Sequence, residues 1–528
     1  MTAAATSIER PARLSRDKAL FLVTALTGSV LINLTAQFAI TNLADIQGAL
    51  GATADEASWL STAYLMATVA GVVASVTLIR TFGAGRYFVA CALLFASSAW
   101  VLAMAESRFV AIAARAVQGF AAGGFGPIAF VAVFTTCVGQ RLPFGLSLLA
   151  MAILVPGVAG SVLSGLIEDA MGWRSLFLIQ FWTGAALAMA GLAWLPRAAV
   201  NWPGLRTDWI AIALLCTGLS TLILIVMQGT RHFWLDSDLI VWAVVASGGA
   251  WAGFAFLCRW SPLSIISIEA LLKRKFGVPI LFNLFFRAGL VVTAYLIPVF
   301  LVTVHGFRPL QLSGVFAWSL VPQFLVFPLV WRALHWVDSR VLMGAGLALC
   351  GVATALAMAN TNLVSGEQFR FSMILFGMGQ VLFLVPTLLV GAMSLKPAEL
   401  PTASIVFNVT TVGGGALGVG ILSHFVTERE KFHSNVLTEG ISLYRTLDAD
   451  RISAVSDVLG GRTADAALAT LRAIAMTASG ARREAWVLAF NDGFLLTSVA
   501  LLIGALGVVA VGRCAPLIHL NHTSESRT

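Results

Sequence analysis

The chain has 528 residues, of which 59% are hydrophobic and only 11% are charged, and its formal net charge is +8. Soluble domains carry about 25% charged residues, so this composition excludes a water-soluble fold. No separate basic domain displays the positive charge, and this argues against binding of nucleic acid.

Apolar segments recur along the whole chain, and each is long enough to cross a membrane. About 20 apolar residues in a helix cross a hydrocarbon core about 30 Å thick. The segments cover, approximately, residues 18–41, 56–79, 87–105, 109–135, 142–167, 173–195, 208–227, 238–258, 277–304, 312–334, 341–359, 369–394, 402–426 and 491–512. The sequence therefore predicts an all-α polytopic membrane protein with fourteen transmembrane helices.

The distribution of lysine and arginine predicts how these helices are oriented. Because the number of segments is even, both chain ends fall on the same side, and the loops on that side hold more basic residues than the short loops on the opposite side. Basic loops stay in the cytoplasm. We therefore expect cytoplasmic termini, and we expect the first helix to remain as an anchor rather than to be a cleaved signal peptide.

The first segment carries two amides on one helical face, Asn33 and Gln37, which are four residues apart. Amides at membrane depth hold neighbouring helices together or face a polar cavity, and the sequence leaves both roles open. The loop after the second segment is bracketed by Arg80 and Arg86, and a similar hinge lies between Arg332 and Arg340. Such weak internal repetition is typical of transporters built from two related halves.

The fourth segment contains a permanent charge, Arg115, followed by Gln118 and Gly119. An arginine at the centre of a membrane helix costs roughly 2.5 to 3.5 kcal/mol on insertion scales, so it must face protein or a wet cavity. The fifth segment adds Gly160 and Gly165 to a series of glycines and prolines. Small residues allow close helix packing, and they equally suit helices that bend between two states.

The ninth segment repeats the amide and charge pattern in Asn283 and Arg287. Arg287 lies about 15 Å from the inner end of this segment, close to the membrane midplane. No aspartate or glutamate lies at mid-depth in any predicted helix. A buried carboxylate is the natural counter-ion of a cationic substrate, so its absence favours neutral or anionic substrates.

Two polar segments have the spacing of helices outside the membrane. Residues 264–275 have an apolar face and end in three basic residues, which predicts a helix on the cytoplasmic membrane surface. Residues 428–486 have apolar positions at helical intervals, which predicts short helices that cover the outer mouth of the protein.

Enzymatic motifs are lacking. The sequence has no phosphate-binding loop, no zinc-protease motif and no nucleophile elbow. The six cysteines are scattered without CxxC spacing. We therefore expect a protein that is not an enzyme and that uses no metal or cofactor.

These residues together resemble the major facilitator superfamily, in its fourteen-helix branch of drug:proton antiporters, the EmrB-like and QacA-like proteins. Arg115 to Gly119 matches the Arg-x-x-x-Gly signature of the fourth helix, and Gly160 to Gly165 is similar to a loosened antiporter motif of the fifth. Trp173-Arg174, the stretch from Ala403 to Gly418 and the stretch from Phe490 to Phe494 also resemble this branch. The resemblance covers nearly the whole chain.

The resemblance implies two six-helix bundles that alternate access to a central cavity. The bundles would span residues 18–195 and 277–512, with two inserted helices at 208–258, a cytoplasmic interfacial helix at 264–275, an outer loop at 428–486 and cytoplasmic tails at 1–17 and 513–528. It also implies a bacterial inner membrane protein that can work with a periplasmic adaptor and an outer-membrane channel.

The resemblance further implies roles for the residues singled out above. Arg115, Gln118, Gly119, Gly160 and Gly165 would couple conformational change to transport. Asn33, Gln37, Asn283 and Arg287 would line the substrate cavity, and Arg80 and Arg86 would belong to a cytoplasmic gating loop.

The chain departs from the branch at three positions. Thr35 stands where the branch usually has a first-helix aspartate, Arg80 replaces a loop acid, and Thr411 replaces an arginine of the thirteenth helix. The first change removes an expected proton carrier. The leading expectation is a proton-driven exporter of amphipathic small molecules. The alternatives are a specific exporter of an endogenous organic anion or metallophore, and a membrane scaffold or receptor that transports nothing.

Overall fold

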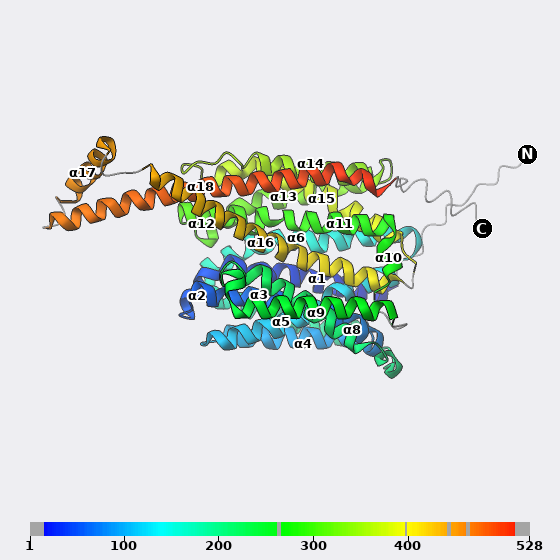
Figure 1. The fold of residues 1–528 in the computed structure, drawn as a ribbon. Coiled ribbons are helices and arrows are strands. Elements are labelled where there is room, and N and C mark those ends of the chain that lie inside the picture. Colours follow the sequence, from blue (N-terminus) through cyan, green and yellow to red (C-terminus); the bar gives the residue numbers. More distant parts are fainter. Residues whose placement is uncertain (1–14, 261–265, 397–398, 441–444, 461–464, 513–528) are drawn as a thin grey trace, which may run out of the picture.

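The structure is a computed structural model that describes residues 15–260, 266–396, 399–440, 445–460 and 465–512. The described residues form helices and turns and no strand. Long helices run nearly parallel to one another in a single slab (Figure 1). The predicted all-α architecture is therefore confirmed.

The first half of the slab consists of α1 (Arg16–Thr41), the short α2 (Leu43–Ala49), α3 (Ala54–Phe82), α4 (Ala84–Ala103), α5 (Arg108–Thr136), α6 (Leu142–Met171) and α7 (Trp173–Trp194). Two further helices follow, α8 (Trp209–Gln228) and α9 (Asp238–Trp260). The second half consists of α10 (Ile268–Leu272), α11 (Arg274–Gly289), the π-helical turn η4 (Val292–Leu296), α12 (Ile297–His305), α13 (Pro309–Ala333), α14 (Ser339–Ala355), α15 (Arg370–Met393), α16 (Leu400–Glu439), α17 (Thr446–Gly460) and α18 (Ala466–Gly507). Short 3-10 turns lie at η1 (Gly139–Arg141), η2 (Trp202–Leu205), η3 (Trp234–Asp236), η5 (Gly366–Phe369) and η7 (Val508–Val511).

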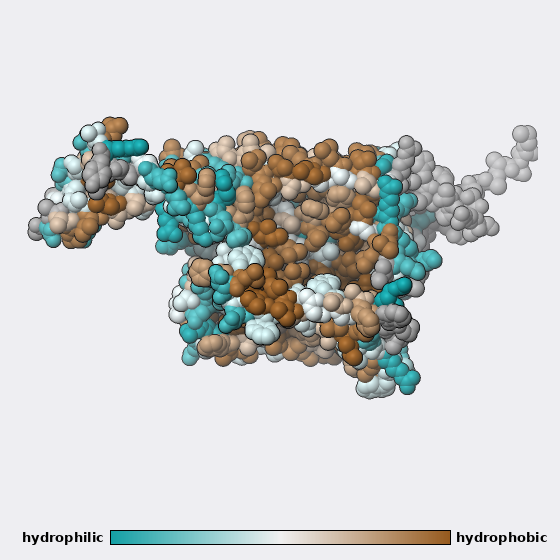
Figure 2. Space-filling view, in the orientation of Figure 1, coloured by the Kyte–Doolittle hydropathy of each residue, from teal (hydrophilic) through white to brown (hydrophobic). Residues whose placement is uncertain are grey.

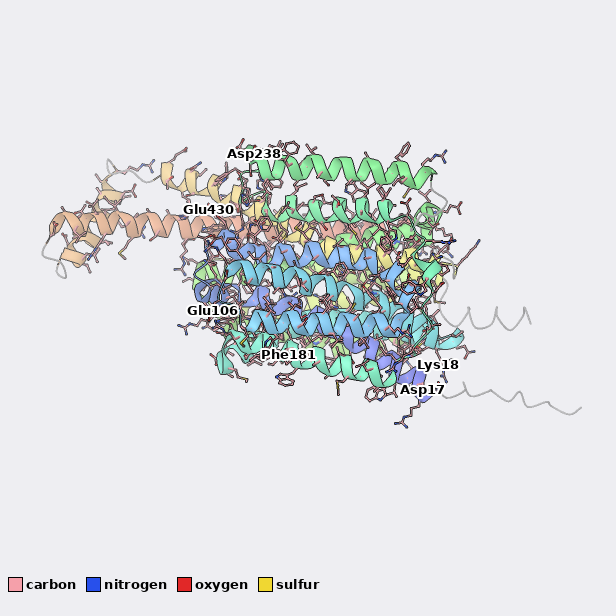
Figure 3. All side chains as sticks on the ribbon, turned by 90° about the horizontal axis from the view of Figure 1, so that it is seen from below. Asp17, Lys18, Glu106, Phe181, Asp238 and Glu430 are labelled. Carbon is pink, nitrogen blue, oxygen red and sulfur yellow. The ribbon has the colours of Figure 1, made fainter. Side chains whose placement is uncertain are left out.

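The slab has the polarity of a membrane protein. A hydrophobic band crosses its middle, and hydrophilic residues gather at both ends (Figure 2). Asp17 and Lys18 lie at one end, here called the terminal end, and Glu106 and Glu430 lie toward the other, while Phe181 lies between them (Figure 3). Thirteen helices in the described part of the chain are long and apolar enough to cross a membrane. The remaining predicted segment, 341–359, corresponds to α14, which has only 17 residues, so the number fourteen stays a prediction.

The two halves meet along two seams. At one seam α6 packs against α13, and at the other α16 packs against α3. Helix α8 lies over the second seam, because it packs against both α3 and α16 as well as against α9. At residue level, Gly420 of α16 lies so close to α8 that an added Cβ would meet the backbone of Val226. Of the two inserted helices, α8 therefore contacts both halves.

Helices α3 and α5 form the closest packing in the first half. Gly71 of α3 lies against the backbone of Phe120, while Gly119 and Gly123 of α5 lie against the backbones of Tyr64 and Thr68. A Cβ at any of the three glycines would collide with a carbonyl oxygen. In a membrane, where helices gain little from the hydrophobic effect, such close approach supplies van der Waals contact.

The segment 428–486 differs from its prediction. Helices α16 and α18 have 40 and 42 residues. At about 1.5 Å per residue each is about twice as long as the hydrocarbon core is thick. Their far ends and α17 project from the slab as an arm, on the side away from the terminal end (Figure 1). The segment is helical as predicted, but within its described part only α17 is a short helix, and the rest continues α16 and α18. The segment also projects outward rather than lying over the bundle (Figure 1).

Ion pairs join α16 and α18 at the base of the arm. Asp492 of α18 accepts from Arg429 Nε at 2.6 Å and from His433 Nε2 at 2.7 Å. Farther out, Arg482 and Glu430 form an ion pair at 3.5 Å. These ion pairs hold α16 and α18 side by side where both helices leave the slab.

The predicted surface helix at 264–275 is only partly described, since residues 261–265 lie outside the described ranges. Helix α10 is five residues long, and α11 begins directly after it at Arg274. Between them, Lys273 Nζ donates to both carboxylate oxygens of Glu399, at 2.7 and 2.5 Å. This contact ties the start of α11 to the start of α16.

The Lys273–Glu399 contact makes a pH-dependent contribution to stability. Hydrogen bonds from Lys273 and Lys396 lower the pKa of Glu399 from its ordinary value of 4.5. A carboxyl group whose pKa is lowered by folding stabilises the protein above its unfolded pKa, and this stabilisation is lost as the pH falls through the folded pKa. We expect Glu399→Gln to lower the melting temperature slightly at neutral pH and to have no effect once the pH is well below 4.5. A difference between the two proteins that persists in acid would contradict this.

Candidate functional site

Arg115 is buried inside the first half of the molecule, with 1% of its surface exposed. Its Nε donates to the backbone oxygen of Leu60 at 3.3 Å, and its Nη1 donates to Oε1 of Gln118 at 2.7 Å. The guanidinium carbon lies 3.9 Å from the centre of the Tyr64 ring. A charged donor gains about 1.5 to 3 kcal/mol per hydrogen bond, and a desolvated cation over an aromatic face gains about 2 kcal/mol.

The network continues from α5 to α7. Gln118 Nε2 donates to Oε1 of Gln180 at 2.7 Å, and both amides are buried. Arg115 thereby links α5 to α3 directly and to α7 through Gln118. Among the described residues no carboxylate forms an ion pair with Arg115, so neutral groups alone compensate its charge. We call Arg115, Tyr64, Gln118 and Gln180 the Arg115 network.

The Arg115 network lies within the first half rather than on a seam between the halves. The sequence leads us to expect that Arg115 faces either protein or a wet cavity. In the structure the arginine borders a small apolar cavity whose lining comes from α1 to α5 and α7, including Ala39, Leu60, Trp173 and Phe177. Arg115 is therefore placed to couple helices of the first half to one another.

The glycines singled out from the sequence are close contacts between helices. A Cβ at Gly119 would collide with the backbone of Tyr64, the residue whose ring covers Arg115. A Cβ at Gly160 of α6 would meet the backbone of Leu34 on α1. Gly165 contacts Ser313 and the backbone of Pro309 on α13, which belongs to the other half. Only Gly165 of these three touches the seam between the halves.

The amides of α1 are half-buried. Asn33 Nδ2 donates to the backbone oxygen of Ser29 at 2.8 Å, a bond within its own helix. The Cβ of Gln37 packs against Gly160. Among the described residues, neither side chain therefore forms a hydrogen bond to another helix. At the terminal end of α3 and α4, Arg80 and Arg86 are both exposed.

In the second half, Asn283 and Arg287 lie where α11 packs against α16. Asn283 is fully buried, and its Nδ2 donates to Thr410 Oγ1 of α16 at 3.0 Å. Arg287 is 5% exposed, and a Cβ at Gly414 of α16 would meet its Cβ. Within the described ranges Arg287 Nε and Nη2 have no hydrogen-bond acceptor, and Asn283 Oδ1 has no donor.

The structure also shows polar residues that we did not single out from the sequence. Gln323 of α13 donates to Gln380 of α15 at 2.6 Å, and both are buried. Gln180 and Thr410 complete the two clusters described above. A search for every amide within the apolar segments would have found Gln180, Gln323 and Gln380. Tyr64 gives a weaker signal, as one of only four tyrosines in the chain.

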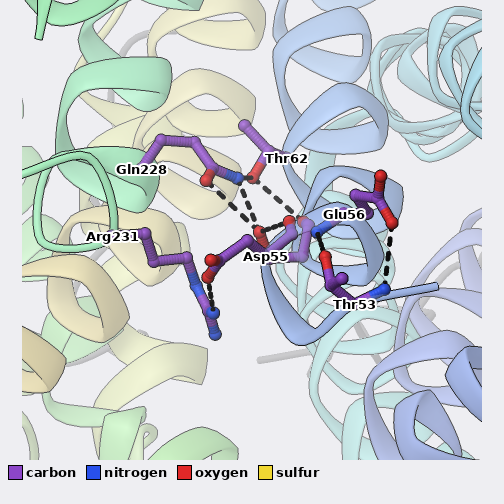
Figure 4. Close-up of polar contacts among 7 residues, drawn as sticks. Thr53, Asp55, Glu56, Thr62, Gln228 and Arg231 are labelled. Atoms are coloured by element: carbon purple, nitrogen blue, oxygen red, sulfur yellow. Dashed lines mark hydrogen bonds and ion pairs between the residues drawn. The ribbon is translucent and has the colours of Figure 1, made fainter.

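A separate polar cluster attaches the last turn of α8 to the first turns of α3 (Figure 4). Gln228 is fully buried and donates to Ser58 Oγ at 3.0 Å and to Thr62 Oγ1 at 2.7 Å. Arg231 and Asp55 form an ion pair at 2.7 Å. Thr53 and Glu56 form a capping box at the start of α3. This cluster fixes an inserted helix and is distinct from the Arg115 network.

Comparison with known proteins shows similarity to one family of membrane proteins and to several of its characterised members. A family model described as Major Facilitator Superfamily matches residues 25–419. The multidrug export protein EmrB of Escherichia coli is 24% identical over 409 residues, which cover 75% of this chain and 78% of that protein. The colistin resistance protein EmrB of Acinetobacter baumannii is 21% identical over 430 residues, covering 80% and 83%. The fatty acid resistance protein FarB of Neisseria gonorrhoeae is 24% identical over 411 residues, covering 76% and 79%.

Solved structures show the same fold at low sequence identity. The human organic anion transporter MFSD10 superposes with a TM-score of 0.55 at 12% identity, covering 93% of this chain and 100% of that one. A proton dependent oligopeptide transporter superposes with a TM-score of 0.57 at 15% identity, covering 93% and 98%. At these identities the likeness establishes the fold alone.

Proposed function

Since the chain belongs to the major facilitator superfamily, whose members are membrane transporters and not enzymes, we propose that it exports amphipathic small molecules of several kinds across a bacterial inner membrane. The observation that carries this proposal is the match to three proteins, one named for multidrug export, one for colistin resistance and one for fatty acid resistance, each across about three quarters of the chain. These relatives favour neither of the two alternatives. One was a specific exporter of an endogenous organic anion or metallophore, and the other was a scaffold or receptor that transports nothing.

Alternating access would occur by movement of the two halves about the α6–α13 and α3–α16 seams. The Arg115 network supports this because it joins three helices of the first half into one unit. The Gly165 contact lies on a seam and would change when the halves rock. Asn33, Gln37, Asn283 and Arg287 would line the route of the substrate.

We propose that a proton gradient drives export, as the resemblance to drug:proton antiporters implies. The first-helix position that usually holds an aspartate is Thr35, which is buried and donates within its own helix to Ile32. The proton carrier would therefore be a different group from the one the branch usually uses.

The orientation and the partners follow from the same proposal. Among the short loops, those at the terminal end hold more lysines and arginines than those at the opposite end, Arg80 and Arg86 among them, and this supports a cytoplasmic terminal end. Arg274 and Lys275, which are exposed, would then meet anionic lipid at the cytoplasmic surface. The arm would stand in the periplasm, where an adaptor protein and through it an outer-membrane channel could be reached.

Transport into inverted membrane vesicles tests the proposed function. We expect neutral and anionic amphipathic dyes to accumulate several-fold in vesicles that contain the protein when the interior is acidified, and cationic dyes to accumulate less. Vesicles without the protein are the control. Accumulation equal to that control would contradict export, and accumulation that survives collapse of the pH gradient would contradict proton coupling.

A further inference from the structure

We propose that Arg287 and Asn283 bind the head group of an exported molecule, and that this head group is a carboxylate with a hydrogen-bond donor beside it. The inference rests on the proposed export function. It adds the chemical class of the ligand and the residues that recognise it.

The first argument is that the charge of Arg287 lacks compensation within the described part of the chain. The side chain is 5% exposed, no ion pair joins it to a carboxylate, and its Nε and Nη2 have no acceptor. A buried charge without a partner is strongly unfavourable. Arg115 is buried as deeply, yet a carbonyl, an amide and an aromatic ring surround its guanidinium. The guanidinium carbon of Arg287 has the Phe286 ring at a longer distance, 5.9 Å from the ring centre. The fold therefore supplies hydrogen-bond acceptors to Arg115 and supplies none, among the described residues, to Nε and Nη2 of Arg287. An external anion would supply them.

The second argument concerns the atoms that the site offers. Asn283 and Arg287 are four residues apart on α11, so they lie on one helical face with their Cβ atoms about 5–6 Å apart. Asn283 uses its Nδ2 on Thr410, and this leaves Oδ1 as a free acceptor. The guanidinium is a planar fork that matches a carboxylate. A ligand that satisfies both residues carries a carboxylate and, close to it, an N–H or O–H group.

The third argument is the break in the helix beside the site. Helix α11 ends at Gly289, two residues after Arg287, and the π-helical turn η4 precedes α12. Interrupted helices near the midplane are where transporters commonly hold their substrates, because the break frees backbone groups and space. The atoms of Arg287 and Asn283 that lack described partners therefore lie on α11, next to a break in the helix that suits substrate binding.

The fourth argument is an apolar cavity one helical turn from Asn283. Its lining includes Pro279 and Ile280 of α11, Phe407 of α16 and Phe130 of α5. Most of the lining comes from α11, α15 and α16 of the second half, and Phe130 is its one contribution from the first half. Gly413 and Gly415, on either side of the glycine that packs against Arg287, face open space. This cavity has only about 10 Å³ of free space, room for one water at most. The aromatic or aliphatic body of a molecule bound at Arg287 would therefore enter it only after the surrounding helices move apart.

The experiment measures binding to the purified full-length protein in lipid nanodiscs, which requires no transport. The probes are N-benzoylphenylalanine, which has a carboxylate next to an amide N–H, and its neutral primary amide. We expect the wild type to bind the acid at least about tenfold more tightly than the amide. Arg287→Gln should remove this preference, and Arg287→Lys, which keeps the charge but loses the fork, should retain part of it. Arg370→Gln, which removes an exposed arginine by the same substitution, should leave it unchanged.

Several results would overturn the inference. Equal affinity of the wild type for acid and amide would do so without any variant, and so would a preference that survives in Arg287→Gln. Melting temperatures show separately whether the variant is folded. Without ligand, we expect the melting temperature of Arg287→Gln to equal or exceed that of the wild type, because an unpaired buried charge is removed. We expect the acid to raise the melting temperature of the wild type but not that of Arg287→Gln.

Transport of the same probes separates the two proposals. A wild type that binds the acid preferentially but exports neither probe would contradict the export function and leave the anion site standing. A wild type that exports the amide as well as the acid, and an Arg287→Gln variant that loses both equally, would contradict the anion site and leave export standing.

Discussion

Replacing Arg115 with alanine is expected to abolish export while the protein remains folded and inserted. The substitution removes two hydrogen bonds from a charged donor and a contact with the Tyr64 ring. The two hydrogen bonds alone are worth about 3 to 6 kcal/mol. Because these bonds hold helices of the first half together as one unit, their loss would let that half deform instead of moving against the second half. The measurement is the rate of dye accumulation in inverted vesicles.

Two further variants show whether the network or the charge alone is required. Arg115→Lys keeps the charge but cannot hold Leu60 and Gln118 in the same way, so it should also be strongly impaired. Arg370→Gln removes an exposed arginine and should export normally. The amount of folded protein is checked by fluorescence size-exclusion chromatography. Normal export by Arg115→Ala would refute the role given to this residue.

Much of the fold could be predicted from the sequence because membrane thickness sets the length of an apolar helix. The ends of α16 and α18 could not be predicted in this way. Hydropathy falls near residue 426 and recovers near 491, and we placed the helix ends there. Both helices continue through the polar stretch, because backbone hydrogen bonding in a helix does not depend on hydropathy and because alanine, frequent in the first half of α18, favours helix.

The candidate site was predicted only as single residues. A charge in an apolar segment identified Arg115 and Arg287, but their surroundings depend on residues far away in the sequence. One group that binds Arg115 is a backbone oxygen, that of Leu60, which has no sequence signature. The two arginines looked equivalent in the sequence. The structure distinguishes them, since only Arg287 lacks described acceptors for its buried nitrogens.

Replacing Gly165 with alanine is expected to reduce export at least about tenfold by separating the halves. An added Cβ would collide with Ser313 and the backbone of Pro309 on α13, so α6 and α13 must move apart at this end. Overpacking of this kind costs about 1 to 3 kcal/mol. Because the contact joins the two halves, the cost falls on the state in which this end of the seam is closed. The protein should therefore populate that state less.

Gly157→Ala is the matched control, because it makes the same substitution two turns away on α6, where a Cβ meets no atom within 4 Å. Spin labels on cysteines placed at Leu166 and Leu310, which are 49% and 39% exposed, report the distance between α6 and α13. We expect Gly165→Ala to shift this distance to longer values and Gly157→Ala to leave both distance and export unchanged. Two results would contradict this argument. If Gly165→Ala lowers export without changing the distance between α6 and α13, the glycine acts within its own helix and the seam is not the moving contact.

If Gly165→Ala and Gly157→Ala lower export equally, α6 requires glycine for flexibility, because an added Cβ collides with other atoms only at position 165.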